Sequence, residues 1–265
     1  MKRPSMIRAK IFLLCAFSVW SVIFIATAAA ESIDLTLRNS TNNKLLVAID
    51  AWPPFRILEE DEYRGIDFEL WTRLADELGL TLEFVRCPWV RCLKMMENGD
   101  VDAMSGLALR EDRAVYMEYL PPAYYQCSTV FYVKKGQGHR IHRYRDLYQL
   151  NVGIVAGSAY FQPFDKDPNI SKVSVSTEKQ LIQMLGKERI PAIIGTDCQA
   201  DYEIAQSPFK GFFEKAEYRP GNSVNLYFAI SKKSKFREKR EDFTRALESL
   251  LRTGAVEDIQ QVYLH

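Results

Sequence analysis

Short apolar runs alternate with helix-like segments along nearly the whole chain. Residues 44–50 (KLLVAID) and 81–86 (TLEFVR) have the length and composition of strands, whereas residues 65–79 carry apolar side chains at helical spacing. In that segment Leu70, Leu74 and Leu78 share one helical face, and Gly79 supplies a stop signal. Alternation of this kind is typical of an α/β protein.

Similar patterns predict the other elements. A short helix over 91–97 ends at Asn98-Gly99, and Thr177 with Gln180 indicates a capping box that opens a helix through Leu185. Two further helices, separated by Gly254, close the chain. The remaining apolar runs predict strands starting at Val101 and covering 127–133, 152–156, 173–175, 192–195 and 224–230.

The first thirty residues have a different character. A basic start is followed by an almost unbroken apolar run over 11–25 and by small residues with A-x-A spacing before Glu31. These features predict a signal peptide over 1–30, cleavage near Glu31 and export to the periplasm. An uncleaved membrane anchor over 11–30 is the alternative interpretation, because that length just spans a bilayer.

Charge and ligand types narrow the classes of function. The full chain has a net charge of +1, and removal of four leader cations leaves about −3 without any concentrated basic face. A nucleic-acid partner is therefore not expected. The three histidines form no Cys/His cluster with metal-ligand spacing, so neither a metal nor a cofactor is predicted. A monomer is the default expectation.

Four cysteines remain after the leader: Cys87, Cys92, Cys127 and Cys198. In an oxidising compartment they allow three disulfide pairings. Cys87 and Cys92 flank a short loop at a strand-to-helix turn, which allows Cα atoms within about 7 Å, so we predict a disulfide there. An active redox pair is the alternative, although C-x-x-C spacing is absent.

Six segments, in order, resemble the bacterial extracellular solute-binding proteins of the polar-amino-acid class, such as the histidine- and glutamine-binding proteins. Together they cover essentially the whole mature chain. The segments are 47–55 (VAIDAWPPF), 65–70 (GIDFEL), 101–113 (VDAMSGLALREDR), 152–158 (VGIVAGS), 225–231 (NLYFAIS) and 251–259 (LRTGAVEDI).

The resemblance implies a type II periplasmic-binding-protein fold, in which two α/β lobes enclose the ligand and two hinge strands join them. The hinges would lie near 128–134 and 224–231. Lobe one would hold residues 31–128 plus 229–265, and lobe two residues 129–228. Because a bond between a hinge and lobe two would hinder closure, Cys127 and Cys198 are expected to stay separate buried thiols.

Arg113 falls where the family places its carboxylate-binding arginine. A guanidinium holds a carboxylate through two parallel hydrogen bonds, although a solvated helix arginine is the alternative interpretation of Arg113. Gly157 and Ser158 end an apolar strand and are expected to open a helix, so that free amides and the positive helix end grip the anion from lobe two. A plain glycine turn is the other possibility there.

Two tryptophans match the apolar and aromatic positions that sandwich the ligand in the family. Trp52 and Trp89 would offer contact area and attract cations, although both are also compatible with core packing. Asp50, in the first matching segment, is placed in the same ligand site.

This sequence departs from the family at two places. The lobe-one hydroxyls that hold an amino-acid ammonium fall at Ser105, Gly106 and Ala108, so one hydroxyl remains. The acid of lobe two aligns with Thr196, with Asp197 next to it as a substitute. A carboxylate on the ligand is therefore predicted more firmly than an α-amino group.

The resemblance implies a protein that captures a small solute and delivers it to the membrane permease of an ABC transporter. A ligand sensor for a membrane receptor is the second interpretation. A third is a dehydratase-type enzyme on the same scaffold, for which Asp50, Asp197 or Glu111 would be the acid or base. No second catalytic group is evident beside them, so no catalytic residue is predicted.

Overall fold

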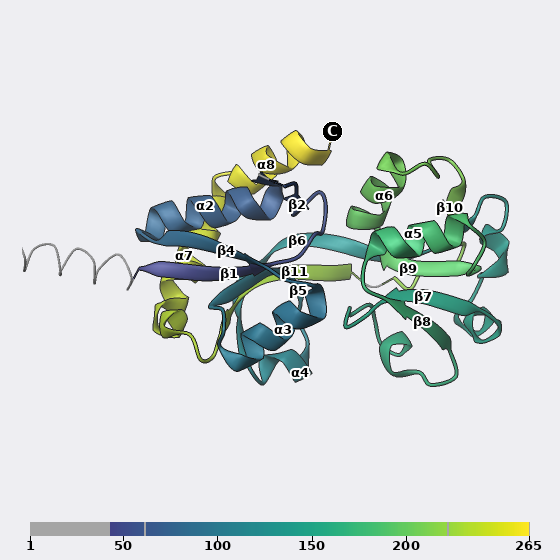
Figure 1. Ribbon diagram of the computed structural model, residues 1–265, viewed down its shortest axis with the longest axis horizontal. Coiled ribbons are helices and arrows are strands. Elements are labelled where there is room, and N and C mark those ends of the chain that lie inside the picture. Colours follow the sequence, from purple (N-terminus) through teal and green to yellow (C-terminus); the bar gives the residue numbers. More distant parts are fainter. Residues whose placement is uncertain (1–42, 61, 222, 265) are drawn as a thin grey trace, which may run out of the picture. The chain divides into compact units, whose positions relative to one another are not determined.

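The computed structural model describes residues 43–264, apart from residues 61 and 222. The predicted signal peptide and its cleavage position therefore lie outside the described residues. Strands and helices alternate as the sequence pattern predicts, and the fold is a mixed α/β arrangement around a large sheet (Figure 1). In the part of the chain that the structure describes, no helix is long and apolar enough to cross a membrane.

The strands are β1 (Lys44–Ile49), β2 (Ile57–Leu58), β3 (Tyr63–Arg64), β4 (Thr81–Arg86), β5 (Ala103–Ala108), β6 (Met117–Lys134), β7 (Asn151–Val155), β8 (Ser171–Val175), β9 (Ala192–Thr196), β10 (Phe213–Lys215) and β11 (Ser223–Ser231). The helices are α2 (Ile66–Leu78), α3 (Trp89–Asn98), α4 (Glu111–Ala114), α5 (Glu178–Gly186), α6 (Asp197–Gln206), α7 (Arg240–Arg252) and α8 (Ala255–Leu264). Short 3₁₀ turns lie between several of them.

A first core forms around β4, β1, β5, β11 and the beginning of β6, which are hydrogen-bonded neighbours in that order. The apolar faces of α2, α7 and α8 pack together on one side, where Leu70, Leu247 and Ile259 are buried in one cluster. Helix α3 covers the opposite side with Cys92 and Met96. Figure 1 shows α2 and α8 together on one side of β1 and β4, and α3 on the other.

A second core forms around the end of β6 and strands β9, β7 and β8. Leu181 of α5 and Ala200 of α6 are buried on one side of these strands. Phe131, Leu147 and Phe164 pack on the other side. The two cores give the two-lobed architecture its separate hydrophobic interiors.

Strand β6 connects the two cores. Its residues from Met117 to Ser128 pair with β11, and those from Thr129 to Val133 pair with β9. Strand β11 pairs antiparallel with both β5 and β6. The change of partner at Ser128 falls within the first segment that the sequence predicts as a hinge.

Glycines at both ends fix the limits of α2 as predicted. Gly65 precedes the helix with φ 125°, and a Cβ there would lie 2.6 Å from the Pro54 carbonyl oxygen, so no other residue fits without movement. Gly79 ends the helix in the left-handed conformation with φ 63°. Elsewhere Thr177 caps α5 by accepting a hydrogen bond from the Gln180 amide, which confirms that predicted start.

Helix α6 was not predicted from the sequence pattern. Residues 197–206 (DCQADYEIAQ) form α6, although they have few apolar side chains and no helical stripe strong enough to indicate it. The helix follows β9 directly and packs against β6 and α5. Its position is therefore determined by tertiary packing rather than by its own sequence pattern.

Two disulfides are present among the described residues. The predicted bond joins Cys87 to Cys92, with a Cα–Cα distance of 5.4 Å. The expectation of separate thiols at Cys127 and Cys198 is wrong, because these two are also bonded, with Cα atoms 5.7 Å apart. The bond ties the first turn of α6 to β6 beside Ser128, where the chain passes between the two cores.

Asp197 and the two bonded cysteines also place three possible metal-ligand atoms within 4.8 Å of one another. Both sulfurs are engaged in the disulfide, so thiolate ligands are not available in this arrangement.

Candidate ligand-binding site

A cavity lies between residues of the first core and residues of the second. It receives side chains from the segment after β1, from α3, β5 and α4 on one side, and from β7, α5 and β9 on the other. Its wall includes seven of the ten predicted site residues. These seven are Asp50, Trp52, Trp89, Gly106, Arg113, Ser158 and Thr196.

Arg113 is the central cation of this cavity. The short helix α4 follows β5 and places the residue where only 4% of its surface is exposed. One of its nitrogens, Nη2, donates to the Gly157 carbonyl oxygen at 2.6 Å, and the guanidinium lies 5.3 Å from the centre of the Trp89 ring. Within the described residues, no carboxylate forms an ion pair with it. Burial therefore lowers the pKa of Arg113.

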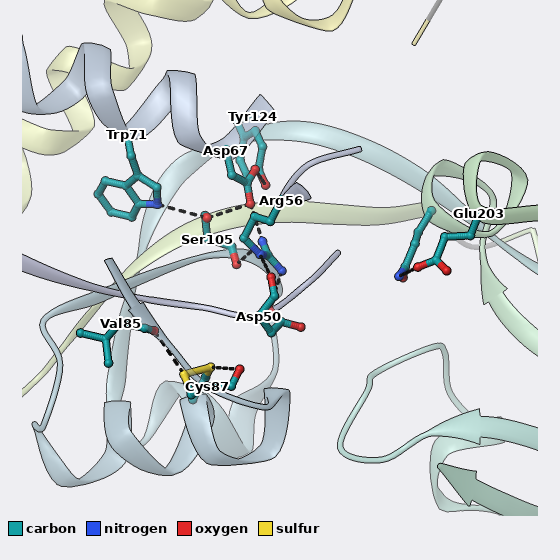
Figure 2. Close-up of polar contacts among 11 residues, drawn as sticks. Asp50, Arg56, Asp67, Trp71, Val85, Cys87, Ser105, Tyr124 and Glu203 are labelled. Carbon is teal, nitrogen blue, oxygen red and sulfur yellow. Dashed lines mark hydrogen bonds and ion pairs between the residues drawn. A yellow bond between two sulfur atoms is a disulfide. The ribbon is translucent and has the colours of Figure 1, made fainter. Parts of the chain in front are cut away.

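A second guanidinium, from Arg56, also lines the cavity, and sequence reasoning missed it. Its side chain is only 3% exposed, and Nη2 forms an ion pair with Asp50 Oδ1 at 2.8 Å. Nη1 pairs with Asp67, and Nε donates to the Asp50 carbonyl oxygen at 3.1 Å (Figure 2). Although burial opposes the charged form, the two carboxylates raise the pKa of Arg56.

Further hydrogen bonds hold Asp67 in place. Tyr124 Oη donates to Asp67 Oδ1 at 2.6 Å, and Ser105 Oγ donates to Asp67 Oδ2 at 2.8 Å. Trp71 Nε1 in turn donates to Ser105 Oγ at 3.1 Å. Figure 2 shows these side chains converging on Arg56 from α2, β5 and β6. The serine hydroxyl, predicted to contact ligand, is therefore turned into this network and does not line the cavity.

Gly106 explains how Arg56 fits beside β5. The glycine has φ 72°, and a Cβ at this position would lie 2.6 Å from Arg56 Nη1 and 3.2 Å from the Trp52 ring. The guanidinium thus occupies space that a side chain at position 106 would need. A serine or threonine at position 106 would therefore collide with Arg56 in this arrangement.

The two tryptophans lie where the resemblance places them. Trp52 stacks on Phe55 with ring centroids 4.4 Å apart, and its ring lies 5.1 Å from the Arg56 guanidinium carbon. Trp89 begins α3, and its Nε1 is buried without a hydrogen-bond partner in the described part of the chain. Trp89 lines the cavity, and a native interior rarely leaves such a donor without a ligand or water to accept its hydrogen bond.

The expected helix opening at Gly157 and Ser158 is wrong. Gly157 has φ 72°, and the Ser158 amide donates back to the Val155 carbonyl oxygen at 3.1 Å, so the chain closes a turn instead of starting a helix. The carbonyl of Gly157, not its amide, faces Arg113. A helix-dipole grip on an anion is therefore absent at this turn, although Ser158 itself lines the cavity.

The two candidates for the lobe-two acid are separated by the structure. Thr196 lines the cavity at the end of β9, whereas Asp197 begins α6 and borders a different pocket. Asp197 Oδ1 accepts a hydrogen bond from the Ser128 amide at 2.8 Å. Its carboxylate is therefore used to join α6 to β6.

The second core contributes a buried acid that sequence reasoning missed. Glu178, the first residue of α5, is 5% exposed and lines the cavity beside Gly195. Burial and the nearby carboxylate of Glu203 raise the pKa of Glu178 to about 8. A sequence signal for Glu178 did exist. Thr177 marks the start of this helix, and Glu178 follows it directly, shortly after the carboxyl end of a strand.

The residues considered as an acid or base for catalysis do not converge. Burial raises the pKa of Asp50, but Arg56 opposes this through its charge and hydrogen bond. Glu111 is exposed on α4, and Asp197 borders the other pocket. Among the described residues, the three do not form a catalytic pair.

Three comparisons with solved structures agree with this fold. A mutant of ArgBP from T. maritima is 21% identical, with a TM-score of 0.74 over 84% of this chain and 96% of that one. The amino acid ABC transporter substrate-binding protein AbpA from Streptococcus pneumoniae, bound to L-arginine, is 24% identical, with a TM-score of 0.72 over 84% and 95%. An ancestral amino acid-binding protein, described as a precursor of cyclohexadienyl dehydratase, is 21% identical, with a TM-score of 0.73 over 85% and 96%.

At these identities the likeness establishes the two-lobed, type II periplasmic-binding-protein fold. The family comparison goes further, because the model for bacterial extracellular solute-binding proteins, family 3, matches residues 45–265. That range includes both cores, both disulfides and the complete cavity. The chain therefore belongs to the family 3 bacterial extracellular solute-binding proteins.

Proposed function

We propose that this protein captures a small carboxylate-bearing solute, an amino acid or a relative of one, in the cavity around Arg113. The observation that carries the proposal is the buried guanidinium of Arg113, which has no carboxylate partner among the described residues. Buried charges in native proteins are almost always compensated, so an anion is the expected occupant of this position.

The surroundings of Arg113 support a carboxylate in particular. The guanidinium lies against the Trp89 ring, and Trp89 Nε1 is a buried donor that likewise has no partner in the described part of the chain. One guanidinium nitrogen is used by the Gly157 carbonyl, which leaves other N–H groups for a planar anion. Trp52, stacked on Phe55, provides an aromatic face for the remainder of the solute.

The transport role is part of the same proposal. Solved relatives are described as amino acid ABC transporter substrate-binding proteins, which supports delivery of the solute to a membrane permease. We infer export to the periplasm with cleavage near Glu31, action as a monomer, and closure about the segments near Ser128 and Ser223 where β6 and β11 leave the second core. A ligand sensor using the same closure is the alternative role.

Catalysis is not part of the proposal. One relative is a precursor of a dehydratase, but the cavity acid Asp50 is held by Arg56 and the other two candidates lie elsewhere. Recovery of an unchanged solute after incubation with the protein is the expected result. A chemically altered solute would favour the enzyme interpretation.

Replacement of Arg113 by Met tests the site directly. This variant keeps the length of the side chain but removes the charge and its hydrogen bonds, so affinity should fall about 30-fold to several-thousand-fold. The measurement is calorimetric titration against a panel of amino acids, their amides and simple carboxylic acids.

Arg91→Met is a suitable control, because Arg91 is exposed on α3 and does not line the cavity. It should bind the panel as the wild type does. Equal affinity of Arg113→Met and wild type would disprove the carboxylate site.

A further inference from the structure

Glu178 is a buried acid at the edge of the ligand cavity, and its Oε1 atom has no hydrogen-bond partner among the described residues. Glu178 is the first residue of α5, and its side chain lies against Gly195 of β9. A Cβ added to Gly195 would lie 2.5 Å from Glu178 Oε1. That oxygen has no hydrogen-bond partner within the described part of the chain. Because Gly195 has no side chain, the Glu178 carboxyl group fits beside it, although no described residue forms a hydrogen bond with Oε1.

Within the described ranges, no cation contributes to the electrostatic environment of Glu178. Helix α6 contributes Glu203, which has the same charge sign. The phenols of Tyr132 on β6 and Tyr160 after β7 are neutral. Tyr132 donates a hydrogen bond to Asp201, and Tyr160 accepts one from the Val155 amide. Lys179, the next residue of α5, interacts through its charge with Glu203.

Burial without a cation disfavours the carboxylate, so the free protein holds Glu178 as a neutral acid at pH 7. The elevated pKa of about 8 agrees with this picture. Its place in the first turn of α5 favours the charged form once a cation arrives, because the positive end of the helix dipole lies there.

The charges around the cavity show what kind of group would use this acid. A solute carboxylate neutralises Arg113, while the Asp50 carboxylate is held, together with that of Asp67, in ion pairs with Arg56. A cationic nitrogen on the same solute then requires another acid. Among the described acids that line the cavity, Asp50 is paired, and Glu178 is the one that remains.

We propose that Glu178 couples solute capture to the release of one proton. The buried carboxylic acid ionises when it accepts a hydrogen bond from a cationic nitrogen of the solute, and its proton passes to the solvent. This inference rests on the proposed function, since it assumes that Arg113 holds the solute carboxylate. It narrows the substrate class to zwitterionic amino acids and distinguishes them from plain carboxylic acids.

Calorimetric titration with L-glutamine and with L-arginine tests the coupling. At pH 7, in two buffers with different ionisation enthalpies, the wild type should release close to one proton for each amino acid bound. As the pH is raised toward 8, the affinity should increase about tenfold for each pH unit, and it should level off above pH 8. Release with both amino acids assigns the contact to the α-ammonium, whereas release with L-arginine alone assigns it to the side-chain guanidinium.

Three variants locate the proton. Glu178→Gln should bind more weakly at pH 8, release no proton and show an affinity independent of pH. Gly195→Ala keeps the acid but displaces its carboxyl group, so it should reduce both affinity and proton release. Glu217→Gln alters an exposed acid paired with His142 and should behave as the wild type does. Circular dichroism confirms that each variant is folded.

The outcomes separate the two proposals. Binding to the wild type without proton release from either L-glutamine or L-arginine overturns the coupling but leaves the Arg113 site intact. Proton release that persists in Glu178→Gln overturns the assignment to this residue. If neither amino acid binds, the amino-acid specificity and the coupling both fail.

Discussion

The arrangement of Arg56 depends on the absence of a side chain at Gly106. The guanidinium is held by carboxylates from two other segments of the chain, Asp50 and Asp67, and lies against β5 without room to spare. Because the same guanidinium lies over Trp52, movement of Arg56 would also shift the aromatic wall of the cavity. The network therefore preorganises one wall of the site.

Gly106→Ala should disturb both stability and ligand binding. The new methyl group would meet Arg56 Nη1 at 2.6 Å, and overpacking of this kind typically costs about 1–3 kcal/mol in addition to the strain of a positive φ. Urea unfolding monitored by tryptophan fluorescence measures the stability, and calorimetry measures the affinity.

Gly211→Ala is a matched control, because Gly211 has φ 81° and no heavy atom within 4 Å of an added Cβ. It carries the backbone strain without the collision, so its loss of stability should be smaller and its affinity unchanged. Equal losses in the two variants would contradict the packing argument.

The sequence pointed to some residues of the cavity wall and missed others for a physical reason. Arg113 and Trp52 lie in segments whose local pattern resembles the family, so their positions could be predicted from neighbours in sequence. Arg56 and Glu178 acquire their roles from distant residues: Arg56 from Asp67, and Glu178 from Gly195. Such roles depend on tertiary contacts that no local pattern reveals.

At the level of elements, strands and most helices were predictable because their apolar periodicity is strong. The start of α5 followed from its cap, and α2 from its two glycines. The turn at Gly157 was one of two interpretations that the sequence left open, because the choice depends on a single backbone conformation. Helix α6 was not predictable, because it depends on packing against β6. The disulfide between Cys127 and Cys198 was not expected, because a bond between a hinge and lobe two was assumed to hinder closure.

Loss of the two disulfides should have unequal effects. The Cys127–Cys198 bond joins residues 71 apart in sequence, and the Cys87–Cys92 bond joins residues 5 apart. In the chain-entropy model the longer loop contributes about 4 kcal/mol and the shorter about 2 kcal/mol. Urea unfolding of the Cys127→Ala/Cys198→Ala and Cys87→Ala/Cys92→Ala variants measures the difference.

The order of the two effects is the critical result. We expect the Cys127→Ala/Cys198→Ala variant to lose more stability than the Cys87→Ala/Cys92→Ala variant. The opposite order would show that the short disulfide stabilises mainly by supporting Trp89 locally and not by restricting the unfolded chain.

At the scale of the whole molecule, the two cores meet through a small number of polar contacts around the cavity. Arg113 donates to the Gly157 carbonyl oxygen, and Arg110 forms an ion pair with Asp165 at 3.4 Å. A solute carboxylate bound to Arg113 would join the same two cores through an additional set of hydrogen bonds. Closure should therefore be favoured by the solute, because only the closed form completes these contacts.

Small-angle scattering measures this closure. Saturating solute should reduce the radius of gyration of the wild type without changing its circular dichroism spectrum. The Arg113→Met variant, titrated over the same concentrations, should need far more solute for the same change. A wild-type curve that does not respond to bound solute would contradict closure, unless the free protein already has the compact dimensions.

The bond between Cys127 and Cys198 also affects how the protein would respond to limited proteolysis. It encloses β7, β8, α5 and β9, which include most strands of the second core, within one covalent loop. A single cut between residues 128 and 197 would therefore not release a fragment. The nicked chain would migrate as one species on a non-reducing gel and separate into two only after reduction, so both halves of the ligand cavity would stay tethered at the pivot.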